Sequence, residues 1–264
     1  MTNTIADRDA RGALPGLLAP GPTLVLSVGS LAAWAGTLAW ALQSGNGPGT
    51  MGFGIGAFVA MWSLMMTAMM LPVTIPSVAR SYAGPAGPAV SLGGGAIGAF
   101  VAGYVLLWAM TGVVAYPAAA GAGHLAAHDP VAARATAVAL FAVAGLYQMS
   151  DAKSRCLEHC RRYVSGPAGP GGSTWYGGIR HAVWCLGCSW ALMALFIAVG
   201  VMNIAAMVII TVGLFTERHL LGGLRGQRFR LLTGLALIGF GVAVAFWPSL
   251  AAGLHAMPQG MDHM

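Results

Sequence analysis

The chain has 264 residues, of which 57% are hydrophobic and only 8% are charged, and its mean hydropathy is +0.74. A soluble globular protein carries about 25% charged residues, so a chain with a third of that fraction cannot cover a water-exposed surface. The composition excludes intrinsic disorder, a coiled coil and a soluble nucleic-acid-binding protein, and it predicts a protein embedded in a membrane.

Long apolar runs set the predicted fold. A bilayer core of about 30 Å requires roughly 20 mostly apolar helical residues for each crossing. The fifth and sixth runs are separated only by the segment 200–203, which we interpret as a tight hairpin because a single helix across both would overshoot the bilayer. We therefore expect an all-α, polytopic membrane helix bundle with about seven transmembrane helices, at residues 22–42, 51–71, 95–118, 131–149, 182–200, 203–217 and 230–247.

The first apolar run is interpreted as a helix of the bundle and not as a secretory signal. Asp7 and Asp9 interrupt the basic segment that a signal peptide would need, and the run is longer than the apolar part of a typical signal. The expected organisation has four parts: a cytoplasmic N-terminal segment at 1–21, the bundle at 22–247, a cytoplasmic cysteine-containing loop at 150–181 within it, and an extracytoplasmic tail rich in Met and His at 248–264.

The basic residues favour one orientation of the spans. Cytoplasmic loops of bacterial membrane proteins are enriched in Lys and Arg near the span ends. With the N-terminus inside and the C-terminus outside, only Arg134 of the 13 basic residues falls on the outer side. We therefore expect a multi-pass protein of the bacterial cytoplasmic (inner) membrane. The other basic residues are Arg8, Arg11, Arg80, Lys153, Arg155, Arg161, Arg162, Arg180, Arg218, Arg225, Arg228 and Arg230.

The second run carries an unusual density of methionine. On a helix, Met61, Met65 and Met69 recur at every fourth position, and Met66 and Met70 form a second row beside them. Thioether sulfur is a soft, neutral ligand that suits Cu(I) and costs little to bury in lipid. The alternative is that these methionines only fill the core, as flexible Met side chains often do.

The segment after the fourth run contains a first pair of cysteines. If it is helical, Cys156 and Cys160 lie one turn apart on one face, and His159 lies beside Cys156. Nearby arginines would favour the thiolate form that binds metals.

A second cysteine pair opens the fifth run. His181, Cys185 and Cys188 share one helical stripe at the same predicted membrane boundary as the first pair. Thiolates from neighbouring helices can complete a site for Cu(I) or Zn²⁺. Two alternatives stay open, namely unrelated buried thiols and a pair that exchanges disulfides, although the cytoplasmic side disfavours stable disulfides.

The predicted outer side holds further soft ligands. Met202 and Met207 lie at the outer hairpin, and His124 and His128 are expected in the outer loop between the third and fourth runs. The tail resembles a copper-scavenging segment, because imidazole serves Cu(II) and thioether serves Cu(I). Its candidate ligands are His255, Met257, Met261 and His263, and the alternative is that these residues occur in the tail by chance. Glu217, Arg218 and His219 end the sixth run and are expected to anchor it at the interface, with a charge pair as the alternative.

Four motifs occur here in a familiar order: Met65 to Pro72, Cys156 to Arg161, His181 to Met193, and Gly200 to Asn203. Over about 50–222 the chain resembles a bacterial domain-of-unknown-function family of predicted metal-binding integral membrane proteins. One member type of that family is linked to copper delivery for a polyphenol oxidase. The resemblance implies a copper chaperone or transporter, with the motif Met and Cys residues as ligands.

The leading hypothesis is a non-enzymatic membrane protein that binds Cu(I), with zinc as the alternative metal. It would act as a chaperone or a transporter that supplies the metal to a cuproenzyme. Its expected partners are the lipid bilayer, a cuproenzyme client or soluble copper carrier, and further copies of itself, but no nucleic acid. The competing hypotheses are a membrane thiol-disulfide oxidoreductase and a structural subunit of a membrane complex in which Met and Cys only pack.

Overall fold

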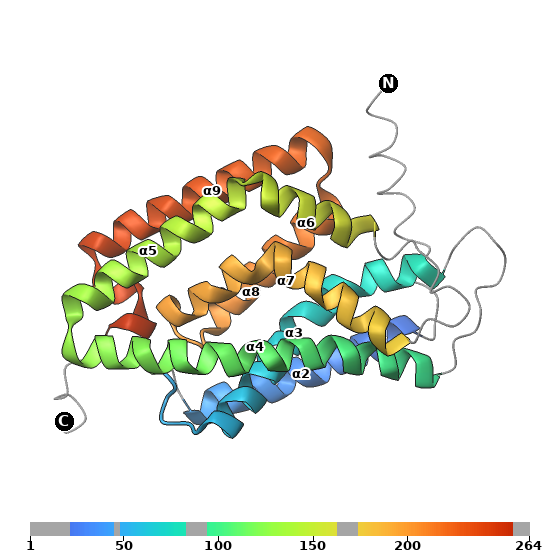
Figure 1. Cartoon of the computed structure of the whole chain (residues 1–264), viewed down its shortest axis with the longest axis horizontal. Coiled ribbons are helices and arrows are strands. Elements are labelled where there is room, and N and C mark those ends of the chain that lie inside the picture. Colours follow the sequence, from blue (N-terminus) through green and yellow to red (C-terminus); the bar gives the residue numbers. More distant parts are fainter. Residues whose placement is uncertain (1–21, 45–47, 83–93, 163–173, 256–264) are drawn as a thin grey trace.

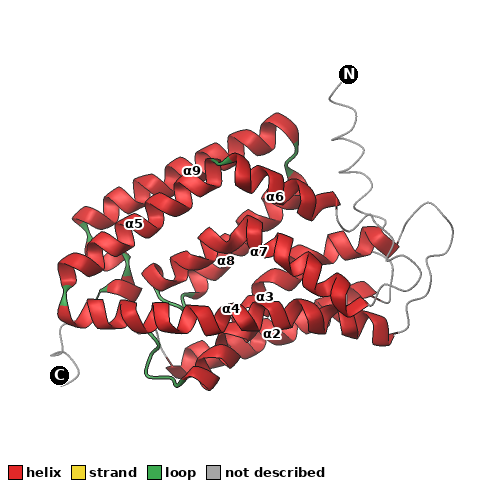
Figure 2. Ribbon diagram, in the orientation of Figure 1, coloured by secondary structure: helices red, strands yellow, loops and turns green. Residues whose placement is uncertain are grey.

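The computed structural model describes residues 22–44, 48–82, 94–162 and 174–255, and these ranges form helices and turns without a strand (Figures 1 and 2). This confirms the all-α prediction. The elements are α2 (Pro22–Ser44), α3 (Ile55–Tyr82), α4 (Gly94–His128), α5 (Pro130–Met149), α6 (Asp151–Arg162), α7 (Thr174–Val199), α8 (Ile204–Phe215), the π-helix η2 (Thr216–Leu220), α9 (Gly223–Phe246), and the 3₁₀ turns η3 (Pro248–Leu250) and η4 (Ala252–Leu254).

Six of the described helices are long and apolar enough to cross a membrane: α2, α3, α4, α5, α7 and α9. The predicted span 203–217 accounts for the difference from seven. Here α8 has 12 residues and is continued by the π-helix η2 of five residues. At 1.5 Å per residue α8 is about 18 Å long, which is shorter than a bilayer core.

The cysteine-containing connection between two spans includes a helix, which is the condition under which the spacing places Cys156 and Cys160 on one face. The structure places α6 over residues 151–162 and starts α7 at Thr174, before the predicted start at 182. Likewise, α4 continues to His128, so His124 and His128 lie on a helix and not in a loop. The predicted N-terminal segment lies outside the described residues.

Local sequence signals fix two helix starts. Asp129 caps α5 by accepting a hydrogen bond from the Ala132 backbone N at 2.9 Å, and Pro130 occupies the first turn, where it removes no helical hydrogen bond. Asn203 caps α8 in the same way through the Ala206 backbone N at 3.0 Å. Gly200 adopts a φ of 98° in the predicted hairpin between α7 and α8.

The bundle is built from helix pairs. Figure 1 shows α5 beside α9 at one edge, α2 beside α3 at the other, and α7 and α8 between them. Glycines allow α4 and α7 to approach closely, because a Cβ at Gly178 would collide with the Phe100 carbonyl and one at Gly103 with the Trp175 carbonyl. The most deeply buried face belongs to α3, which carries the methionine rows into the core.

Candidate metal centre

Three cysteine sulfurs from two helices converge on one arginine. Cys160 comes from α6, and Cys185 and Cys188 come from α7. The Nη2 atom of Arg218 lies 2.7 Å from the Cys160 sulfur and 3.3 Å from each of the other two sulfurs. All four side chains are buried. We call Cys160, Cys185, Cys188 and Arg218 the thiol centre.

The α7 stripe positions its two cysteines as the sequence spacing predicts. Cys188 lies one turn after Cys185, and its sulfur approaches the Cys185 carbonyl at 3.1 Å. Ser189 donates its hydroxyl to the same carbonyl at 2.7 Å. These contacts hold both thiols on the face of α7 that meets α6 and η2.

Arg218 comes from the π-helix η2, a rare local geometry that often marks functional sites. Its Nη1 atom is buried and has no hydrogen-bond partner among the described residues. Burial lowers the pKa of Arg218, but the nearby sulfurs of Cys160, Cys185 and Cys188 outweigh that effect and raise the pKa above its ordinary value. The guanidinium therefore remains a cation inside the bundle.

The Cys160 thiol, unlike the charged guanidinium of Arg218, favours its neutral form. Hydrogen bonding to Cys185 and Cys188, followed by burial, raises the pKa of the Cys160 thiol well above its usual value, and Arg218 only partly offsets this. The Cys160 thiol therefore favours its protonated form.

On the side facing α3 and α4, the thiol centre meets a thioether and a phenol. The sulfur of Met70 lies 4.0 Å from the Cys185 sulfur, and the Tyr104 hydroxyl lies 3.2 Å from it. Thr74 stands behind both, with its hydroxyl 2.9 Å from the Met70 carbonyl and 3.2 Å from the Tyr104 hydroxyl. The last turn of the methionine rows therefore adjoins the thiol centre.

A buried ion pair lies next to Arg218 in the chain. Lys153 Nζ is 2.8 Å from Glu217 Oε2, with the two side chains 1% and 2% exposed. Gln148 contacts both partners: its side-chain oxygen accepts from Lys153, and its amide nitrogen donates to Glu217 at 3.4 Å. Arg161 donates to the backbone carbonyl of Glu217. These contacts fix η2 against α5 and α6, and the acceptors that Arg218 contacts are the three cysteine sulfurs.

The other predicted ligands of this region lie around the thiol centre and not within it. Cys156 is half-buried, and its sulfur lies 3.0 Å from the position that a Cβ on Gly187 would take. His181 is buried with its ring centroid 5.8 Å from that of Tyr104. His159 is exposed and stacks on Trp184 at 4.4 Å.

Within the described residues, no three side chains of His, Cys, Asp or Glu are grouped as ligands of a metal ion. In the thiol centre the three sulfurs share a guanidinium nitrogen as their common neighbour. A metal ion held by these sulfurs would require Arg218 to move aside.

The methionine candidates are buried in the bundle. Met70 contacts the Cys185 sulfur. The others line the same buried core: Met61, Met65, Met66, Met69, Met202 and Met207.

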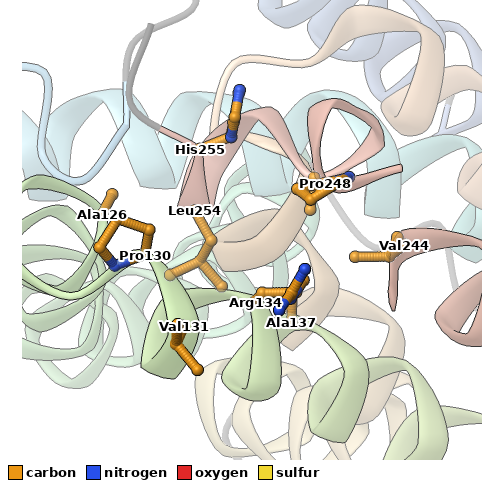
Figure 3. A pocket seen from close by; sticks show the side chains of 10 residues that line it. Ala126, Pro130, Val131, Arg134, Ala137, Val244, Pro248, Leu254 and His255 are labelled. Atoms are coloured by element: carbon orange, nitrogen blue, oxygen red, sulfur yellow. The ribbon is translucent and has the colours of Figure 1, made fainter. Parts of the chain in front are cut away.

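The start of the predicted tail is packed against the bundle. The turns η3 and η4 cover residues 248–254, and η4 contacts α7, α4 and α5. His255 follows and lines a pocket of about 250 Å³ together with Arg134 (Figure 3). Met257, Met261 and His263 lie outside the described residues.

Four important groups were given another role or not considered in the sequence analysis. Arg218 and Glu217 were expected to anchor a span end at the interface, but both are buried, so that expectation is corrected. Tyr104 was not considered, and Lys153 was counted only as a topology signal. The available signal was the rarity of charge in so apolar a chain, since ionisable groups beside apolar spans are costly and are retained for a role.

These features define a class of protein, an all-helical bundle with six helices able to cross a membrane and a buried cluster of thiols. Residues 59–244 match the family model PpoB2, described as a copper chaperone. The chain belongs to this copper chaperone family, which confirms the resemblance seen in the sequence motifs. No curated protein matches the chain. No solved structure matches it either.

Proposed function

We propose that this chain is a membrane copper chaperone that carries Cu(I) on Cys160, Cys185 and Cys188 and passes it to a cuproenzyme. The observation that carries the proposal is the convergence of three sulfurs from α6 and α7 on one point. Thiolate sulfur is a soft donor that favours Cu(I), and membership of a copper chaperone family favours copper over zinc.

Charge balance supports a role for Arg218 in that site. A Cu(I) ion with two thiolates carries one net negative charge, which is costly in an apolar interior. The guanidinium of Arg218 supplies the opposite charge at the sulfur atoms, and the Lys153–Glu217 pair is already balanced by itself. Arg218 would move off the point shared by the sulfurs and remain beside them as the counter-ion.

The methionine rows on α3 are proposed as weaker transfer sites. Residues four apart on a helix are separated by about 6 Å along its axis, so Met61, Met65 and Met69 form a stepped row, and Met70 ends the second row at Cys185. Neutral thioethers bind Cu(I) weakly enough to release it, which transfer requires. The thiol centre would then be the tight end of the route.

The remaining expectations complete the proposal. The bacterial cytoplasmic membrane, with the N-terminus and the thiol centre on the cytoplasmic side, follows from the distribution of basic residues. The role is delivery and not catalysis, and either a soluble carrier or the client enzyme would exchange copper with the protein. His181 precedes Cys185 by one turn of α7 and lies beside Tyr104, so it would support the thiol centre from outside it.

The test is anaerobic loading of the purified full chain with Cu(I), followed by measurement of bound copper. We expect the triple variant C160S/C185S/C188S to lose the tightly bound copper, because hydroxyl oxygen is a poor ligand for Cu(I). C156S is the matched control, since it removes a thiol of the same helix that lies outside the centre. Full copper retention in the triple variant, or equal loss in C156S, would overturn the assignment.

A further inference from the structure

A pair of histidines lies on α4, far from the thiol centre. His124 and His128 are exposed and four residues apart, so they share one face of the helix. Their ring centroids are 4.2 Å apart and the ring planes differ by only 17°. Two imidazoles at this spacing on one helical face are a recurrent arrangement for binding a transition metal through both rings.

Hydrogen bonding prepares one of the rings for this role. The Nδ1 atom of His128 lies 3.0 Å from the backbone carbonyl oxygen of His124. Donation from Nδ1 to a backbone carbonyl orients a histidine ring and leaves Nε2 as the lone-pair donor, which is how metal-binding histidines are commonly held. Nε2 of the exposed His128 ring therefore keeps its lone pair as a ligand atom, and the ring is stacked on that of His124.

The surroundings favour a two-ligand, exchangeable site. The carboxylate of Asp129, the next residue, accepts a hydrogen bond from the Ala132 backbone N and caps α5, so it is already used. Ala126, which lies between the two histidines in sequence, is buried and lines the pocket beside His255 (Figure 3). The histidine pair thus occupies the solvent-facing side of α4 at the end of the bundle where the C-terminal tail begins.

We infer that His124 and His128 form a second metal site, which binds a divalent transition metal ion, in this context Cu(II), through two imidazole nitrogens. Imidazole is a good ligand for Cu(II), whereas the buried thiols suit Cu(I). The ligands are neutral and only two in number, with water completing the coordination, so the site would exchange its ion readily. This site is independent of the thiol centre and does not require the proposed function to hold.

The experiment uses the full chain in detergent with all four cysteines changed to Ser, because thiols would reduce Cu(II). Circular dichroism checks that this background keeps its helix content. Titration with Cu(II) alone, followed by electron paramagnetic resonance, should show one ion with nitrogen couplings from imidazole. H124A and H128A should each weaken that site by about 100-fold, because the second imidazole acts at a high effective concentration.

The matched control is H159A. His159 is also exposed on a helix, and its Nδ1 lies 2.9 Å from the carbonyl of the residue four positions earlier, but it has no histidine partner one turn away. The same titrations in an H255A/H263A background exclude Cu(II) bound by the histidines of the tail. An unchanged Cu(II) affinity and spectrum in H124A/H128A, or their loss in H159A alone, would overturn the inference.

A second measurement does not require the variant in which the four cysteines are changed to Ser. In the wild-type chain, diethyl pyrocarbonate modifies exposed imidazoles, and mass spectrometry locates the modified residues. Zn²⁺ should protect His124 and His128 together while leaving His159 reactive. Equal modification of all three with and without Zn²⁺ would contradict a shared site.

Discussion

The two ends of α4 adjoin candidate ligand sets of opposite character. Near its start, Tyr104 touches the thiol centre, where sulfur and a guanidinium are packed together without exposure to solvent. At its end, the side chains of His124 and His128 are exposed. The stretch of helix from Tyr104 to His128 is about 36 Å long at 1.5 Å per residue, so the two sets cannot share an ion.

The difference follows from charge. Thiolates are anions, and an anion can be buried only beside a cation, which explains why Arg218 accompanies the cysteines. Imidazoles bind metals in their neutral form and need no such partner, so they function in contact with water. The buried set is therefore expected to hold its ion tightly and selectively, and the exposed set to exchange it.

The largest expected effect concerns the ion pair that fixes the buried set. Changing Lys153 to Met leaves Glu217 buried without its partner, and such a loss costs about 3–5 kcal/mol of stability. We expect K153M to lower the thermal unfolding temperature in detergent markedly. The double variant K153M/E217L should recover most of this loss, because apolar groups can replace a buried pair.

R228A is the control for that prediction, since Arg228 is an exposed cation on α9. It should leave the unfolding temperature almost unchanged. If K153M were no more destabilising than R228A, the Lys153–Glu217 pair would not be what holds η2 in place.

The second effect separates the two ligand sets directly. R218M keeps the bulk of the side chain but removes the positive charge beside the sulfurs. We expect the Cu(I) affinity of the thiol centre, measured by competition with a chelator, to fall by about 100-fold, which corresponds to about 3 kcal/mol. R218K should recover part of it, and Cu(II) binding at His124 and His128 should not change.

An R218M variant with unaltered or increased Cu(I) affinity would contradict the role of Arg218 as counter-ion. It would instead mean that the guanidinium mainly competes with the metal for the sulfurs. Parallel loss of the histidine site would indicate that the variant is misfolded.

Much of this fold could be predicted from the sequence, because apolar runs of membrane length determine helices directly. The run at 203–217 was harder, since η2 at its end is held by tertiary contacts from Lys153 and Arg161. Helical spacing also predicted that Cys185 and Cys188 share a face, as they do.

Spacing within one helix could not tell which cysteine of α6 meets α7 at the centre. Cys156 and Cys160 are equivalent by that criterion, but the crossing of the helices sets Cys156 against Gly187 and Cys160 against Arg218. Arg218 itself is 30 residues or more from every sulfur that it contacts. Such long-range partners depend on how the helices pack, which hydrophobic periodicity does not encode.

The smallest expected effect tests whether the methionine rows take part in transfer or only fill the core. M70L conserves volume closely, so stability should change by less than about 1.5 kcal/mol, while the thioether 4.0 Å from the Cys185 sulfur is lost. We expect the rate of copper transfer to a chelator to fall about threefold to tenfold, because about 1 kcal/mol of stabilisation of the transferring ion would disappear.

M61L is the matched control. Met61 is equally buried, but it begins the methionine rows on α3, at the end opposite Met70. A slower rate in M70L alone would assign a role to the last thioether, next to the thiol centre, whereas slowing in both variants would extend the route along α3. If neither variant slowed release, the methionines would be packing residues, and the thiol centre would have to exchange copper directly with a partner at its own end of the bundle.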